Sequence, residues 1–335
     1  MKLKKLTTLL IGAVVALGVV GCSSSNTVEE SDATSPETVM IKTLNGNKEE
    51  VDLEVPFDPQ RIAILDLASL DIIDSLGKGD RVVGSAETKI EYLKSYSENA
   101  EIKNLGTIKE ADLEAVMECE PDVIFIGGRL AESYDELSEI APVVYLETNT
   151  EIGLVESIKN NATTIASMFG LESEIETKMA QFTDRIKALS EVAEGKNALV
   201  GMTTSGGFNL LGNDGRCSII GKEIGFENLT KESASEGKGE GKGNTSSHGN
   251  ESSFETIVKM NPNYIFVMDR DSAIGTEGAQ SAKEIMENEL VKGTEAYKNG
   301  NIVYMANPNV WYTAEGGIKA LDIMLADLES GLGIK

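Results

Sequence analysis

Three of the six arginines in this chain stand where parallel strands would end. Arg129 and Arg270 directly follow apolar segments that we expect to be buried strands, and Arg216 follows the segment 208–212 through an Asn-Asp-Gly turn. Ligands of open parallel sheets bind beyond the carboxyl ends of the strands. Because a guanidinium offers five donors and stays charged at any relevant pH, three of them could bind one compact anion. The other three arginines precede strands or lie in a predicted helix and are expected to be structural: Arg61, Arg81 and Arg185.

Two further side chains could bind a metal. His248 is the only histidine and lies in 232–250, a segment of Gly, Lys, Glu and Ser that predicts a loop. Tyr312 and the only tryptophan, Trp311, follow the apolar segment 301–306 and an Asn-Pro-Asn turn, again at a predicted strand end. Imidazole nitrogen and phenol oxygen are both suitable ligands for ferric iron. The alternatives are a solvated histidine and, for Trp311, a packing anchor in the core.

Other kinds of site find little support. One histidine cannot build a three-histidine zinc site, and the chain has no G-x-S-x-G elbow, Walker A loop or C-x-x-C pair. Cys119 and Cys217 are too few for a disulfide framework and are expected to be packing residues. The net charge of −25 leaves no basic stripe for nucleic acid. We therefore expect a binding protein without an intrinsic cofactor, and not an enzyme.

One segment of the sequence occurs twice. Residues 113–129 (LEAVMECEPDVIFIGGR) and 254–270 (FETIVKMNPNYIFVMDR) align without a gap and share a Glu in second place, a Pro, the pair Ile-Phe and a final Arg. Each copy predicts an amphipathic helix, a Pro turn, a buried strand and a loop that presents arginine. The repetition indicates two similar lobes that face one anionic ligand.

Alternating apolar and amphipathic segments predict an α/β fold with two lobes, each built on a central parallel sheet. We expect an N-terminal lobe at 39–152, a helical connector at 153–194 and a C-terminal lobe at 195–335. The connector carries one apolar stripe of helical period and is expected to be a long stiff helix, broken or kinked at Gly170. Strands are expected within the two repeats and at 61–66, 81–86, 142–147, 197–203, 208–212 and 301–306, with a final helix at 317–330.

The N-terminus has the pattern of an export signal. Three lysines and an apolar stretch end in Val-Val-Gly before Cys22, which predicts a lipoprotein signal peptide at 1–21. Residues 22–38 are mostly polar and predict a flexible tether. We expect cleavage before Cys22 and a lipid on its thiol, which would hold the protein on the extracytoplasmic face of the cell membrane. An ordinary secretory signal is the alternative.

From about residue 40 to the end, the sequence resembles the cluster A (class III) substrate-binding lipoproteins of ABC importers, and among them the ferric catecholate siderophore-binding proteins. The resemblance implies two Rossmann-like lobes joined by a long rigid connecting helix. The matching segments are IGGRLAE (126–132), NDGRCSIIGKEIG (213–225), SSHGNESSFE (246–255), PNYIFVMDR (262–270) and VWYTAEGG (310–317).

The resemblance also implies roles for individual residues. Arg129, Arg216 and Arg270 would bind catecholate oxygens, with Trp311 beside them, and His248 and Tyr312 could complete the coordination of Fe(III). Glu114 and Glu255 would dock into arginine pockets of the membrane permease, although glutamate is also ordinary on a helix surface. The segment before His248 is longer than is usual in the family. The two glutamates are assigned by position, as the second residue of each repeat.

The implied function is the capture of a ferric siderophore and its delivery to an ABC permease and its ATPase. The protein is expected to be a monomer tethered to the cell membrane, and a Gram-positive origin is expected. The alternative ligands are haem, a hydroxamate siderophore or a corrinoid. A neutral hydroxamate complex would not need three arginines, whereas Tyr312 and His248 keep haem in consideration. The sequence does not name the siderophore, its denticity or the permease.

Overall fold

The computed structural model describes residues 37–230 and 250–334. The predicted signal peptide, Cys22 and His248 lie outside these residues. Across the part of the chain that is described, no helix combines the length and apolar character needed to span a bilayer. Both lobes belong to one compact unit, Pro36–Lys335.

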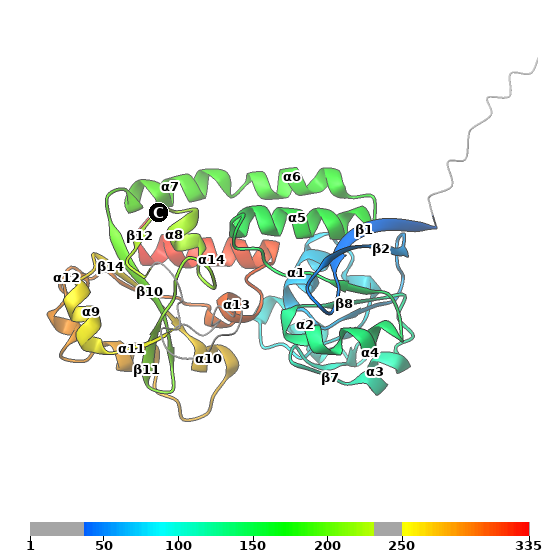
Figure 1. The fold of residues 1–335 in the computed structure, drawn as a ribbon, viewed down its shortest axis with the longest axis horizontal. Helices are drawn as coiled ribbons and strands as arrows, with labels where there is room; N and C mark the ends of the chain where they lie inside the picture. Colours follow the sequence, from blue (N-terminus) through cyan, green and yellow to red (C-terminus); the bar gives the residue numbers. More distant parts are fainter. Residues whose placement is uncertain (1–36, 231–249, 335) are drawn as a thin grey trace, which may run out of the picture. The chain divides into compact units, whose positions relative to one another are not determined.

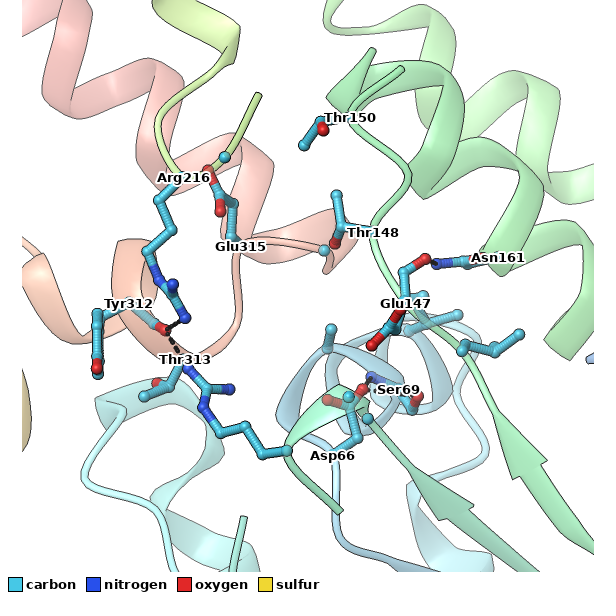
Figure 2. A pocket seen from close by; sticks show the side chains of 18 of the residues that line it. Asp66, Ser69, Glu147, Thr148, Thr150, Asn161, Arg216, Tyr312, Thr313 and Glu315 are labelled. Carbon is cyan, nitrogen blue, oxygen red and sulfur yellow. Dashed lines mark hydrogen bonds between the residues drawn. The ribbon is translucent and has the colours of Figure 1, made fainter. Parts of the chain in front are cut away.

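The first lobe is built on a fully parallel sheet with the strand order β5-β4-β3-β8-β9. The chain starts at β3 and proceeds to one edge through β4 and β5, then returns to β8 and proceeds to the other edge, so the switch point lies between β3 and β8. The loops after β3 and β9 present Asp66 and Glu147 to one space (Figure 2). The predicted strands are confirmed as β3 (Ile62–Ile64), β4 (Val82–Ser85), β8 (Val123–Ile126) and β9 (Val143–Tyr145), with the two-residue β5 (Lys103–Asn104) at the edge.

The sheet of the second lobe is mixed. Its central strands β10, β14 and β15 are parallel, as predicted, but β11 and β13 add an antiparallel edge. The reason is local: β10 and β11 are joined by Ser205 and Gly206, whose φ angles are 50° and 80°, and a two-residue hairpin can join only antiparallel strands. The strands are β10 (Asn197–Thr204), β11 (Gly207–Leu210), β12 (Glu227–Asn228), β13 (Asn250–Ser252), β14 (Tyr264–Asp269) and β15 (Ile302–Tyr304).

The duplicated sequence forms the duplicated structure that was predicted. Helices α3 (Leu113–Glu118) and α9 (Phe254–Met260) each begin at a side chain that caps the backbone, Asp112 and Ser253. Each is followed by a left-handed residue, Glu120 (φ 42°) or Asn261 (φ 43°), just before the shared Pro. A residue in this conformation ends a helix, and Pro cannot continue it. The two units therefore share the positive φ angle of the residue at which the chain turns toward β8 or β14.

The connector consists of three helices, not one long helix. Helix α5 (Leu154–Ser167) ends before Gly170 (φ +67°), where a break was predicted, but α6 (Glu172–Ala180) and α7 (Thr183–Ala193) are separated again at Gln181 and Phe182. No Gly or Pro marks this second break. Figure 1 shows α6 and α7 following one another from the first lobe to the second. The predicted break at Gly170 is confirmed, and α6 and α7, separated by a second break that was not predicted, together form the connection.

Other elements surround the two sheets. An N-terminal hairpin, β1 (Thr38–Leu44) with β2 (Glu50–Pro56), was not predicted, and it joins β9 through the hydroxyl of Thr43, which accepts from the Tyr145 amide at 2.7 Å and donates to the Tyr145 carbonyl at 3.0 Å. The remaining elements are β6 (Gly106–Thr107), β7 (Glu110–Ala111), α2 (Lys94–Glu98), α4 (Tyr134–Ser138), α8 (Ile219–Lys222), α10 (Arg270–Ile274), α11 (Ala282–Met286), α12 (Glu295–Lys298), α13 (Pro308–Thr313) and the 3₁₀ turns Gly79–Arg81, Glu91–Leu93, Gly128–Ser133 and Val291–Gly293.

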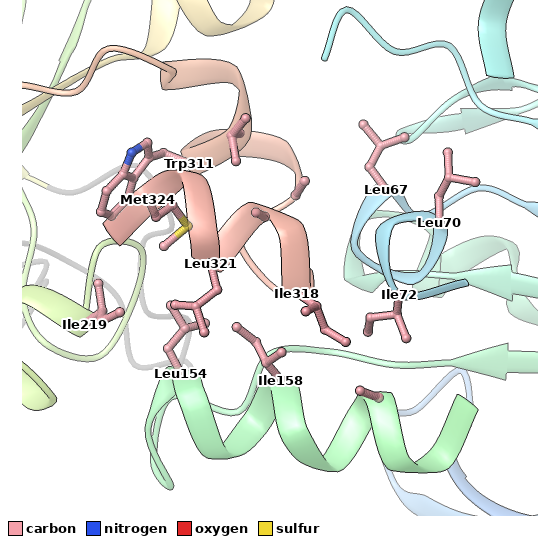
Figure 3. Packing of buried hydrophobic residues seen from close by; sticks show 14 of the residues in the cluster. Leu67, Leu70, Ile72, Leu154, Ile158, Ile219, Trp311, Ile318, Leu321 and Met324 are labelled. Carbon is pink, nitrogen blue, oxygen red and sulfur yellow. The ribbon is translucent and has the colours of Figure 1, made fainter. Parts of the chain in front are cut away.

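Helix α1 (Leu67–Ser75) of the first lobe packs against α14 (Ile318–Gly331) of the second. Figure 3 shows side chains of α1, α14 and α5 meeting in one apolar core that includes Leu70, Ile158 and Leu321. The buried carboxylate of Asp71 in α1 accepts hydrogen bonds from the amides of Lys319 and Ala320, both at 2.9 Å. The first turn of α14 is thus capped by a residue 248 positions away in the other lobe.

This cap should contribute strongly to stability. Asp71→Ala removes the acceptor and leaves buried amides without it, so we expect the free energy of unfolding in urea to fall by about 2–4 kcal/mol. Trp311, fully buried, reports the transition by fluorescence. The matched control is Asp74→Ala on the same helix, which loses only a bond from the Tyr96 hydroxyl at 2.5 Å within the first lobe and should cost about 1 kcal/mol or less. Equal losses of unfolding free energy in the two variants would show that the cap between the lobes contributes no more than the bond within the first lobe.

Candidate ligand-binding site

A cavity of about 790 Å³ is lined by residues of both lobes. The first lobe contributes the loops after β3, β8 and β9, and the second contributes the loop after β11 and the segment around α13. In Figure 2, Asp66, Ser69, Glu147 and Asn161 stand opposite Arg216 and Tyr312. The cavity therefore lies at the carboxyl ends of the strands, beside the switch point between β3 and β8, where ligands of open sheets bind.

The three predicted arginines meet around Tyr312. The Arg129 guanidinium donates to the Tyr312 backbone carbonyl at 3.0 Å and Arg216 donates to the same oxygen at 3.4 Å, while Nε of Arg270 donates to the phenol oxygen at 3.2 Å. Their Cζ atoms lie 5.5, 4.5 and 5.7 Å from the centre of the tyrosine ring, in the order Arg129, Arg216, Arg270. These distances fall within the range of cation–π contacts. One aromatic side chain thus organises three positive charges from two lobes.

The three arginines do not have equal access to the cavity. Arg129, Arg216 and Tyr312 line it, whereas Arg270 is not a lining residue. Arg270 instead contacts the Thr204 hydroxyl at 3.2 Å and the Asp271 carboxylate at 3.3 Å. It lies behind the phenol and positions it. A direct ligand contact of Arg270 stays a prediction, and in this structure its Nε donates to the Tyr312 phenol oxygen.

The arginines also change the acidity of Tyr312. Burial alone would raise the pKa of the phenol, but the hydrogen bond from Arg270 and the positive charges of Arg216, Arg270 and Arg129 outweigh it and hold the pKa below its usual value. The pKa of Arg129 is lowered, first by burial and then by the charge of Arg216. Deprotonation of Tyr312 is thus favoured by the three neighbouring guanidiniums. A phenolate is a better ligand for a hard cation than a phenol.

Carboxylates form another part of the wall, and sequence reasoning did not single them out. Asp66 caps α1 through Ser69, and Glu147 pairs with Lys48 at 2.7 Å. Glu315 accepts from the Cys217 amide at 2.8 Å, and burial raises its pKa to about 7 in spite of the nearby Arg216. Asp66 directly follows a buried strand, as Arg129 does, so the rule that found the arginines could have found this carboxylate too.

Trp311 is not part of the cavity. Its side chain is fully buried, and Nε1 donates to the Asp327 carboxylate of α14 at 3.0 Å. The expected ligand contact of Trp311 is therefore corrected to the alternative, a packing anchor, because the buried ring lies in the core that also contains Met324 (Figure 3). Cys119 and Cys217 are buried and not joined in a disulfide, as expected of packing residues.

The candidate metal ligands and docking residues lie in different parts of the molecule. His248 lies outside the described residues, and among those described there is no group of three His, Cys, Asp or Glu side chains placed to hold a metal. Glu114 and Glu255 are exposed on α3 and α9 and do not line the cavity. A role for these glutamates therefore concerns an outer surface and not the ligand.

The comparisons with known proteins agree on one family. A family model described as "Periplasmic binding protein" matches residues 62–308. The petrobactin-binding protein YclQ of Bacillus subtilis is 32% identical over 98% of this chain and 99% of its own, and its crystal structure superposes with a TM-score of 0.77 over 89% and 99% of the two chains.

Two further relatives are named for the ligands that they bind. The ferric-anguibactin-binding protein FatB of Vibrio anguillarum is 26% identical over 82% of each chain. The crystal structure of the catecholate-siderophore binding protein VctP of Vibrio cholerae is 30% identical and has a TM-score of 0.75, covering 87% of this chain and all of that one.

Glu315 should make stability depend on pH. Its folded pKa of about 7 exceeds the usual 4.5, so as the pH rises the unfolded chain loses this proton first, and stability falls between about pH 4.5 and 7. Glu315→Gln keeps an oxygen for the Cys217 amide and cannot titrate. We expect its free energy of unfolding in urea to fall less with rising pH than that of the wild type. Over this range the two proteins should differ by on the order of 2 kcal/mol after solvent screening. Parallel pH profiles would contradict the assigned pKa.

Tyr312 should be the tyrosine that ionises first. Near-ultraviolet absorbance of phenolate, followed as the pH is raised, should show an early transition that Tyr312→Phe removes and Arg270→Gln moves to higher pH. Tyr304→Phe is the control, because burial raises the pKa of Tyr304 to about 12. Persistence of the early transition in Tyr312→Phe would show that the arginines do not act on this phenol.

Proposed function

The chain belongs to the periplasmic binding protein family, and on that premise we propose that it captures a ferric catecholate-type siderophore and delivers it to an ABC permease for iron uptake. Family membership makes it an extracytoplasmic binding protein of an importer and not an enzyme. The siderophore is cargo, and no intrinsic cofactor is required. The single observation that carries the proposal is the gathering of Arg129, Arg216 and Arg270 around Tyr312 at the cavity.

Charge and size favour this ligand. A ferric tris-catecholate has three negative charges, equal in number to the guanidiniums around Tyr312. Hydrogen bonds between ionised partners contribute roughly 1.5–3 kcal/mol each, which supports tight binding when several form together. A cavity of about 790 Å³ lies within the range of sites that enclose a small ligand. The relatives YclQ, FatB and VctP, which are named for binding petrobactin, ferric anguibactin and a catecholate siderophore, add support.

The other ligands fit less well. The apolar side chains that line the cavity are few, namely Ala68, Ile72 and Leu146, whereas haem or a corrinoid would need a broad apolar surface. A neutral hydroxamate complex would not need three arginines. The Tyr312 oxygen is proposed to coordinate iron where the siderophore leaves a position open, with His248 as a second such ligand.

The remaining proposals concern the membrane. Lipidation at Cys22 would hold the protein at the extracytoplasmic face of the cell membrane, and it would act there as a monomer. Glu114 and Glu255 would dock onto the permease, one from each lobe. Both are exposed at equivalent positions of α3 and α9, which suits a partner with two similar halves.

The fluorescence of the buried Trp311, which directly precedes Tyr312, offers a test. Ferric petrobactin should quench it at low concentration, whereas ferric desferrioxamine, a hydroxamate, and haemin should bind weakly or not at all. Arg129→Ala and Arg216→Ala should each weaken binding of ferric petrobactin by about 1–3 kcal/mol, and Arg270→Ala should do so through the displaced phenol. Lys283→Ala, which removes one positive charge from the exposed face of α11, is the control. Preference for the hydroxamate, or arginine variants that bind like the control, would overturn the proposal.

A further inference from the structure

We propose that Met117 and Val258 are a pair of apolar docking points, one on each lobe, that contact the membrane permease beside Glu114 and Glu255. The proposal rests on the proposed function, because it assumes an importer as partner. It goes further by assigning to the partner two sockets, each of which combines a positive group with an apolar surface.

Both side chains are exposed, so they contribute little to the stability of the fold through burial. Met117 is 53% and Val258 is 37% exposed. Among the described residues, six large apolar side chains are markedly exposed, and three of them lie on the short helices α3 and α9: Met117, Val258 and Met260. A single exposed apolar residue needs no explanation. Three on two equivalent helices indicate a shared purpose.

The positions correspond residue by residue. Met117 and Val258 occupy the same place in the duplicated unit, three residues after Glu114 and Glu255. Residues three apart in a helix are neighbours on its surface, so each lobe presents a carboxylate next to an apolar side chain. The buried neighbours Val116 and Ile257 fill the cores of their lobes. Packing therefore explains the apolar residues on the inner face of each helix but not the two on the outer face.

The placement suits one large partner with two similar halves. Figure 1 shows α9 at the left and α3 at the lower right, in different lobes and far apart. The lobes are coupled by the buried core between α1 and α14 and by the Asp71 cap. Two points held at a fixed separation bind a two-fold partner more selectively than either point alone. The permease of an importer is the partner of this kind that the family supplies.

Charge argues against other occupants. A second copy of this chain carries 55 acidic and 30 basic residues, so its surface would repel the carboxylates at both points. An anionic lipid surface is disfavoured because Met117 is flanked by the exposed Glu114 and Glu118. Glu114 and Glu255 are both exposed, and their carboxylates would suit a cationic partner. The favoured socket therefore carries arginine or lysine beside an apolar patch.

The test uses the full-length lipoprotein in cells of its source bacterium, with the chromosomal gene replaced by variants. Uptake of radiolabelled iron supplied as ferric petrobactin is measured, and binding of the same complex by each purified variant is measured in parallel. Met117→Ser and Val258→Ser should each lower uptake at limiting ligand several-fold, and the double variant by about tenfold or more, with ligand affinity unchanged. Met40→Ser is the matched control, at an exposed apolar position (59%) on β1 and not on α3 or α9; it should transport like the wild type.

The outcomes separate this proposal from the one on which it rests. Normal uptake by the Met117→Ser, Val258→Ser double variant, combined with loss of uptake in Glu114→Ala and Glu255→Ala, would overturn the apolar contacts and leave the glutamate docking in place. Normal uptake by all of these variants would overturn docking through α3 and α9. Equal losses in the test and control variants would show a general surface effect and also overturn it. Absence of uptake that depends on the wild-type chain would overturn the proposed function itself.

Discussion

The structure brings three guanidiniums into contact with one tyrosine, and this concentration of positive charge determines what the site can hold. Burial, and then repulsion from the charge of Arg216, lower the pKa of Arg129. The Tyr312 carbonyl, ring and hydroxyl contact the three arginines. A multiply charged anion would suit this concentration of positive charge, and a phenol oxygen whose pKa is lowered would add a ligand for the metal within that anion.

The charges stay together only because the lobes are held together. Arg129 comes from the first lobe, whereas Arg216, Arg270 and Tyr312 come from the second, so the cluster depends on the core between α1, α5 and α14 and on the Asp71 cap. The duplicated helix–strand unit places one arginine at the end of β8 and another at the end of β14. The two arginines of the duplicated unit have different contacts. Arg129 lines the cavity, whereas Arg270 donates a hydrogen bond to the Tyr312 phenol oxygen.

Much of this could be predicted from the sequence, because apolar strands followed by arginine place the charge at a known edge of a parallel sheet. The rest depends on tertiary contacts that no local pattern reveals. Trp311 finds its partner in Asp327, sixteen residues away, which turns the ring into the core. The break between α6 and α7 lacks Gly or Pro, and the β1–β2 hairpin depends on Thr43 reaching β9. The carboxylates of the cavity wall went unnoticed because acidic residues are common throughout this chain.

The central claim is that the guanidiniums from the two lobes bind the oxygens of one ferric complex. A crystal structure of the protein with ferric petrobactin bound tests this most directly. The account predicts the complex inside the cavity, with catecholate oxygens at hydrogen-bond distance from both Arg129 and Arg216 and with iron facing Tyr312. A complex seated elsewhere, or one in the cavity that neither arginine contacts, would contradict it.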